Sequence, residues 1–183
     1  MAPLGSVLNP TPPAPVRARL LPSYRVFNAV MMALSEVVPD RVIAPGYDTT
    51  TAACLSEFRD GKYNIYLEIF GGGYGGGAHS DGVDGIDCAL SNCANIPMEA
   101  MELDYPFFRV ENYALIPDSG GKGKHRGGLG FEKSYRILED RVTFATYGDR
   151  FRIAPPGLFG GGPGRHAENL IERDGETIVV GSK

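Results

Sequence analysis

The chain has 183 residues, a formal net charge of -4 and a hydrophobic content of 43%. This length is sufficient for one domain that buries roughly 70% of the surface exposed by its unfolded chain. The negative charge, with a pI near 5.4, argues against a nucleic-acid or anionic-membrane surface, since both need a basic excess. No run of about 18 apolar residues is present, so we expect no transmembrane helix.

Glycine is abundant and unevenly placed. Of the 25 glycines, 19 fall within residues 71–85, 120–130 and 157–164. A disordered glycine-rich chain would scatter them and would lack the hydrophobic content seen here. Collagen is excluded because there is no Gly-X-Y period. The sequence therefore indicates a globular unit whose segments are joined by three glycine-rich loops.

The first element in chain order is an extended surface strap, predicted over residues 1–22. This stretch contains six prolines, which remove backbone donors and fix φ. Residues 23–183 are expected to form a single α+β unit. It begins with a long helix predicted over Ser23–Val38, where apolar residues recur at three- and four-residue spacing. Ser23 can cap this helix and Pro39 stops it.

Short strand-like runs dominate the chain after this helix. Tyr63–Phe70 is rich in β-branched and aromatic residues, and Phe107–Ile116 alternates between apolar and polar residues. A short helix is predicted over Pro97–Leu103, because proline favours a helix start. Two hairpins are also predicted, one joining 131–138 to 141–147 and the other joining 167–172 to 176–180.

These elements predict an α+β fold, mainly antiparallel β, with one long and one short helix and glycine-rich connecting loops. There is no repeated β-α alternation, which argues against a Rossmann or flavodoxin-like layout. Cys54, Cys88 and Cys93 form an odd set without a CxxC pair, and the N-terminus lacks a secretory signal. Both features favour reduced, buried thiols in a cytoplasmic protein.

The first glycine cluster, 71–82, follows a predicted strand as a phosphate-binding loop would. It lacks the GK[ST] ending of a Walker A loop, and no strong helix pattern comes after it. We therefore favour a backbone that adopts positive φ or approaches another segment closely.

A candidate polar site lies within and just after this cluster. It combines one imidazole with three carboxylates: His79, Asp81, Asp84 and Asp87. Mixed nitrogen and oxygen ligands suit several divalent ions, but Asx-type turns explain the same residues more simply. Cys88 and Cys93 have no histidine at zinc-like spacing, so zinc is not supported, and we assign no metal to this chain.

The second cluster, PDSGGKGKHRGGLG over 117–130, carries three cations and a histidine on a flexible loop. Backbone amides together with Lys124 and Arg126 suit a carboxylate or phosphate. The candidate substrate-binding or anion-binding residues are therefore Asp118, Lys124, His125 and Arg126. The competing interpretation is a structural loop with solvated charges, in which Asp118 caps the entrance.

The third cluster, 155–164, has no ionisable residue and is interpreted as architectural. Arg150, Arg152 and Arg165 border it, and we expect them to be surface charges. No catalytic triad can be assembled, because no Ser or Cys lies in a nucleophile-elbow motif and the three histidines are isolated. The catalytic residues stay unassigned.

Several segments resemble the B-type component of the hydantoinase/5-oxoprolinase family. They occur in the family's order and spacing from Gly5 to the C-terminus: GSVLNP, PDRV, IFGGGYGGGAHSDGVDGID, SNCANIPMEAMELDYPFFRVENYALIPDSGGKGKHRGGLG and PPGLFGGGPG. Many relatives read NTRNTP where this chain has Asn92–Pro97, so an arginine is absent at Ala94.

The resemblance implies ATP-dependent ring opening of a cyclic amide such as hydantoin, N-methylhydantoin, 5-oxoproline or a related lactam. It places ATP and Mg²⁺ in an A-type ATPase partner, with no cofactor bound by this chain. It covers only the C-terminal portion of a B-type polypeptide. We therefore expect a fragment that needs the remaining part of that polypeptide and that exposes apolar surface and self-associates when isolated.

Two alternatives remain open. Acetone and acetophenone carboxylases resemble the same pair of components, so a fragment of a carboxylase is the first alternative. The second is a non-catalytic interaction module whose glycine loops only pack against a partner.

Overall fold

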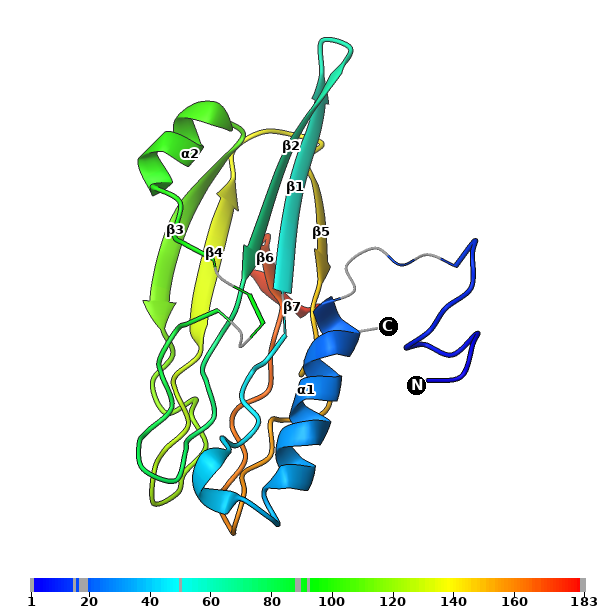
Figure 1. Ribbon diagram of the computed structural model, residues 1–183. Helices are drawn as coiled ribbons and strands as arrows, with labels where there is room; N and C mark the ends of the chain where they lie inside the picture. The colour runs from blue at the N-terminus through cyan, green and yellow to red at the C-terminus, as the bar shows by residue number, and fades with distance from the viewer. Residues whose placement is uncertain are drawn as a thin grey trace.

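The computed structural model describes residues 2–14, 16, 20–49, 51–87, 90–91 and 93–181. The described elements are two α-helices, one short 3-10 helix and seven strands (Figure 1). In chain order they are α1 (Leu20–Leu34), η1 (Pro39–Arg41), β1 (Thr51–Arg59), β2 (Lys62–Phe70), α2 (Met98–Asp104), β3 (Phe108–Leu115), β4 (Phe131–Ile137), β5 (Thr143–Tyr147), β6 (Leu170–Arg173) and β7 (Glu176–Val179). All paired strands are antiparallel, which confirms the α+β prediction.

The strands form one three-stranded sheet and two hairpin-like pairs. The larger sheet has the order β2-β1-β5, while β3 pairs with β4 and β6 pairs with β7. The β1–β2 turn places Asp60 and Gly61 at φ 51° and 76°, and the β6–β7 turn places Asp174 and Gly175 at φ 53° and 78°. Asp-Gly is the preferred dipeptide for such turns because both central residues need positive φ. The predicted hairpin over 167–180 is thereby confirmed.

One hydrophobic core joins the β2-β1-β5 sheet, the β3-β4 sheet and α2. Leu55 of β1 and Tyr66 of β2 are buried against Met101, Phe107 and Phe108. The Tyr66 and Phe108 rings lie 4.8 Å apart between centroids. An aromatic pair at this separation adds attraction beyond the area that it buries. The core therefore fixes β2-β1-β5 relative to β3-β4.

A buried ion pair lies between the same two sheets. Lys133 Nζ of β4 donates to Glu68 Oε1 of β2 at 2.6 Å, and the two side chains are only 3% and 11% exposed. Tyr66 and Tyr135 donate their hydroxyls to Glu68 Oε2 at 2.6 and 2.7 Å. Burial, followed by the hydrogen bond to Glu68, raises the pKa of both tyrosines. Both tyrosines therefore stay protonated donors.

The long helix differs from its predicted bounds. It begins at Leu20 and ends at Leu34, so it includes Leu20–Pro22 of the predicted strap. Pro22 is tolerated in the first turn, where a backbone N–H has no helical partner. At the other end, Ser35 Oγ donates to the Met32 carbonyl at 2.6 Å, a local bond that competes with continued helix.

The predicted hairpin between 131–138 and 141–147 is wrong. Both strands exist, but β4 pairs with β3 and β5 pairs with β1, so the chain crosses between the sheets. Arg141 lies in this crossing at φ 60°, and Val142 packs on the core. The central strand β1 was not predicted, because TAACLSEFR contains few strong strand formers.

Cys54 is half-buried and Cys93 is exposed, and both thiols are free. The expectation of a buried thiol is therefore wrong for Cys93. Cys88 lies outside the described residues.

We predict that Glu68→Ala lowers the free energy of unfolding by about 3–5 kcal/mol, because it leaves the Lys133 ammonium buried without its anion. Chemical denaturation monitored by circular dichroism measures this change. Glu68→Gln/Lys133→Met removes both charges and should cost less. An Ala variant as stable as the unmodified protein would contradict a role for this pair.

Candidate functional site

The three glycine clusters lie against one another at one end of the molecule. We call residues 71–87, 117–130 and 155–165 the glycine layer. In Figure 1 the first two run as long loops beyond the lower ends of β2, β3 and β4, and the third, in orange between β5 and β6, reaches the same lower end. Gly128 N donates to the Tyr74 carbonyl at 2.7 Å, and Gly82 N donates to the Arg126 carbonyl at 2.8 Å. The third cluster joins through Gly162 N, which donates to the Lys122 carbonyl at 2.7 Å.

Close backbone approach explains most of these glycines. A Cβ on Gly73 would overlap the Gly128 carbonyl oxygen, and one on Gly128 would overlap the Val83 carbonyl oxygen. A Cβ on Gly76 would lie 2.6 Å from the His125 carbonyl oxygen. Within the described part of the layer, positive φ among the glycines is confined to Gly85 and Gly160. The expected alternatives were positive φ or close approach, and close approach dominates.

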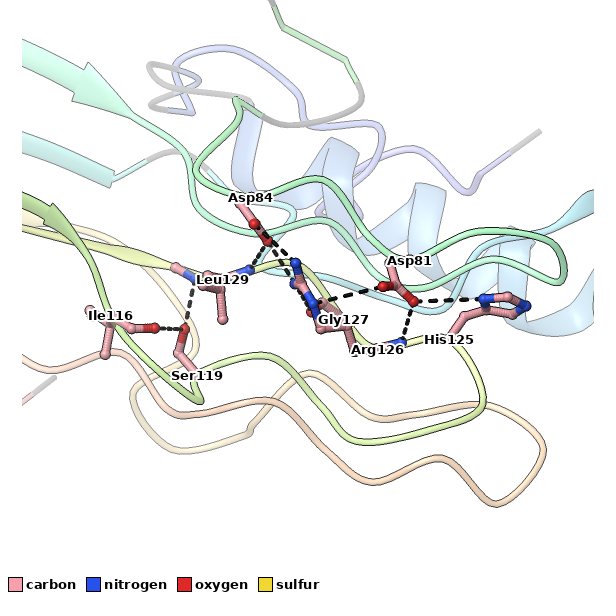
Figure 2. Close-up of polar contacts among 9 residues, drawn as sticks. Asp81, Asp84, Ile116, Ser119, His125, Arg126, Gly127 and Leu129 are labelled. Carbon is pink, nitrogen blue, oxygen red and sulfur yellow. Dashed lines mark hydrogen bonds and ion pairs between the residues drawn. The ribbon is translucent and has the colours of Figure 1, made fainter.

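Two of the candidate side chains form a bidentate ion pair across this layer. Arg126 Nη1 and Nη2 donate to Asp84 Oδ1 and Oδ2 at 2.7 and 3.0 Å (Figure 2). Asp84 Oδ1 also accepts from the Leu129 amide at 2.7 Å. The hydrogen bond from Arg126, and then the one from Leu129, hold the pKa of Asp84 below its usual range. The carboxylate therefore stays ionised and joins the two loops.

Asp81 binds the same loop from the other side of Arg126. Its Oδ1 accepts from the Arg126 amide at 2.9 Å and lies 3.6 Å from His125 Nδ1 (Figure 2). Its Oδ2 lies 3.8 Å from Arg126 Nε. The two candidate groups predicted from separate motifs thus meet as one network: Asp81, Asp84, His125 and Arg126.

The other candidate residues lie outside this network. His79 and Lys124 are exposed, and Asp118 is exposed at φ 57°. Asp87 lies beside Cys93, to which it is hydrogen-bonded. The structure thus brings four of the eight candidate residues together and leaves four apart.

A serine closes the base of the loop that carries Arg126. Ser119 Oγ donates to the Ile116 carbonyl at 2.7 Å and accepts from the Gly130 amide at 2.9 Å (Figure 2). Ile116 N also donates to the Gly130 carbonyl at 2.8 Å. These bonds hold the two ends of the loop together, so its tip projects from β3 and β4.

A second polar cluster, which the sequence did not reveal, is buried under α1. Arg150 was expected at the surface but is only 5% exposed; its Nη2 donates to the Gly46 carbonyl at 3.0 Å. Burial and the nearby Arg25 lower the pKa of Arg150 to about 10. Burial also raises the pKa of Asp48, although its carboxylate accepts from the Gly46 amide. This cluster ties α1 to the loops at 46–49 and 148–150.

Asn28 of α1 completes that cluster. In the amide orientation that satisfies its neighbours, Asn28 donates to Asp48 Oδ2 and accepts from Arg150 Nη2, both at 3.0 Å. Asp48 and Arg150 both adopt positive φ, at 40° and 68°. A non-glycine residue keeps such a strained backbone conformation only where the surrounding contacts hold it there. No local motif marks these residues, because their partners are far away in sequence.

Within the described ranges, no group of three or more His, Cys, Asp or Glu side chains is arranged to hold a metal ion. None of the described helices is both long and apolar enough to cross a membrane.

This chain belongs to the hydantoinase B/oxoprolinase family, whose model matches residues 1–183. One relative, from Pseudomonas sp. (strain NS671), is named as the putative B subunit of a D-/L-hydantoinase. The two are 36% identical over 177 residues, covering 97% of this chain and 29% of that relative. The chain is also 35% identical over 184 residues to the uncharacterized protein MJ0963 of Methanocaldococcus jannaschii, covering 100% of this chain and 32% of the relative.

A longer relative is 5-oxoprolinase of Dictyostelium discoideum. The identity is 28% over 184 residues, covering 99% of this chain and 14% of the relative. The chain therefore spans less than a third of the length of the first two relatives and a still smaller part of the third.

We predict that Gly73→Ala destabilises the fold by about 3 kcal/mol, at the upper end of overpacking costs, because its Cβ would enter the Gly128 carbonyl. Gly77→Ala is the matched control, since its Cβ would lie 3.6 Å from Ile43 Cγ2. Thermal unfolding of the two variants tests this. Equal losses would show that close approach does not explain the cluster.

We predict that Asp84→Asn destabilises the glycine layer by about 1–2 kcal/mol at neutral pH. This is the contribution of a charged hydrogen bond, reduced because solvent screens the pair. Because folding lowers the Asp84 pKa, its contribution is complete above the unfolded value of 3.8 and is lost as pH falls through the folded value. The difference between the unmodified protein and the variant should therefore shrink at acidic pH. Urea unfolding at several pH values measures it, with exposed Asp140→Asn as control.

Proposed function

We propose that this chain forms part of the B-type subunit of an ATP-dependent enzyme that hydrolyses a cyclic amide. The observation that carries the proposal is the family match over the whole chain, 1–183. One relative is named as the B subunit of a hydantoinase and another as a 5-oxoprolinase, and both names refer to cyclic-amide chemistry. The substrate class is therefore a hydantoin, 5-oxoproline or a related lactam.

The chemistry explains why such an enzyme needs a partner. An amide is a poor electrophile, and phosphorylation of its oxygen by ATP activates the carbonyl carbon and releases ADP. Water then adds to this carbon and the ring C–N bond breaks, which leaves a free amine and an acyl phosphate. A second water hydrolyses the acyl phosphate to a carboxylate and phosphate. We assign ATP and Mg²⁺ to an A-type subunit, in a cytoplasmic hetero-oligomer. The glycine layer supports this assignment, because the amides of Tyr74, Gly82 and Gly128 donate to its own carbonyls. A phosphate-binding loop needs such amides free to face the anion.

Within this assembly, the candidate residues have different roles. Arg126 braces the layer, since Asp84 and Asp81 already bind its guanidinium. Lys124 is exposed near the loop tip, beside the half-buried His125. We propose that Lys124 and His125 bind an acidic group. This group is either a carboxylate of the substrate or a carboxylate on the partner subunit. Asp118 lies at the start of this loop, with its backbone at φ 57°.

The test reconstitutes this chain with the remaining B-type polypeptide and an A-type subunit, and measures ring opening of hydantoin and 5-oxoproline. We expect turnover that requires ATP. Lys124→Ala should reduce kcat/KM by about tenfold, the loss of one charged contact of roughly 1.4 kcal/mol, without dissociating the complex. Lys122→Ala is the matched control, because Lys122 is an exposed cation two residues away.

Three other outcomes point elsewhere. Bicarbonate-dependent ATP consumption with a ketone would assign the chain to a carboxylase instead. Unchanged turnover in Lys124→Ala/His125→Ala would favour the non-catalytic interaction module. Failure of the three polypeptides to associate would contradict the proposal as a whole.

A further inference from the structure

The outward face of the β2-β1-β5 sheet, as described by the structure, contains no charged residue. Leu55 and Tyr66 are buried in the core, so their sequence neighbours point away from it. The strand register places the outward residues opposite one another, Phe58 with Tyr63, Ser56 with Ile65 and Cys54 with Leu67. The outward set is Cys54, Ser56 and Phe58 on β1, Tyr63, Ile65, Leu67 and Ile69 on β2, and Thr143, Ala145 and Tyr147 on β5. Ala52 lies on the same side of β1 but is already buried.

The largest of these side chains are exposed in this chain. The exposed fractions are 62% for Phe58, 71% for Tyr63, 54% for Ile65 and 51% for Leu67. The Phe58 and Tyr63 rings lie 4.8 Å apart at the hairpin end, so the apolar surface continues along β1 and β2. A contiguous apolar patch of this kind on a sheet marks an interaction surface.

The outward face of the other sheet has the opposite character. On β3 and β4, Arg136 Nε donates to Glu111 Oε1 at 2.6 Å, and Asn112 donates to Glu132. Charged and polar side chains are the usual composition of an antiparallel sheet face that contacts water. The contrast shows that one outward face suits solvent and the other suits burial.

We propose that the outward face of β2-β1-β5 is the surface on which the remaining part of the B-type subunit packs. This inference rests on the proposed function. The first two relatives carry the region matched by this chain within a much longer polypeptide, of which it is only 29% and 32%. An apolar face needs a covering segment that is itself largely uncharged, because burying an unpaired charge is costly. The occupant is therefore an apolar surface of that same polypeptide.

The test uses as its probe the part of the Pseudomonas relative outside the matching region, expressed as a separate polypeptide. Titration calorimetry measures its binding to the unmodified chain and to Ile65→Glu/Leu67→Glu. We expect at least a hundredfold weaker binding for this variant. Ser134→Glu, on the outward face of β4, should bind like the unmodified chain. Circular dichroism checks that each variant is folded.

Hydrogen exchange on the unmodified chain gives a readout that needs no substitution. Addition of the probe should protect the amides of residues 54–58 and 63–67, and should leave those of 132–136 unchanged. Addition of the probe should also prevent any self-association that the same face causes in the isolated chain.

Three results would overturn the proposal. Binding of the Ile65→Glu/Leu67→Glu variant within threefold of the unmodified chain would place the interface elsewhere and leave the proposed function intact. A dimer that persists in saturating probe would identify a second copy as the occupant. An unmodified chain that is monomeric and does not bind the probe would contradict both this inference and the proposed B-type assembly.

Discussion

The close approach of three backbone segments is the constraint on which the candidate site depends. In the glycine layer, one segment's carbonyl occupies the space that a side chain would need on the next, as Gly73, Gly128 and Val83 show. Backbones at this separation can exchange hydrogen bonds directly, and those bonds set the register between loops far apart in sequence. Only in that register does the Asp84 carboxylate reach both the Arg126 guanidinium and the Leu129 amide.

The three polar networks differ in burial, and burial determines what each contributes. The Glu68–Lys133 ion pair is almost completely buried between the sheets. Removing one partner therefore costs more free energy than forming the pair gains, because the other charge stays buried and unpaired. The Asp48 and Arg150 cluster orients α1 and two loops in the same way. The Asp84–Arg126 ion pair is partly solvated, and solvent screening reduces its contribution to stability. Its main effect is to fix the positions of the two loops that it joins. Together the networks hold the sheets, the helix and the loop layer in one fixed arrangement.

Local signals in the sequence were sufficient for some of these features and not for others. The runs that became β2 and β3 and the Asp174-Gly175 turn are visible because β-branched residues and turn chemistry act over a few residues. The partners of β4 and β5 are not visible, because strand pairing depends on which sheet edge is free. Likewise, the charges of Asp84 and Arg126 are evident, but 42 residues separate them, so their ion pair emerged only from the folded loops.

The same arrangement divides the surface of the chain by chemistry. Because Arg126 is held by two carboxylates, the exposed cation that the layer offers beside His125 is Lys124, and it lies near a loop tip projecting from β3 and β4. The uncharged sheet face lies on different strands, β1 and β2, where Ile65 and Leu67 face outward. A chain that packs through the sheet face can therefore present the loop tip elsewhere without competition between the two surfaces. This separation is what a segment needs if it is to be held by its own subunit while contacting a substrate or a partner.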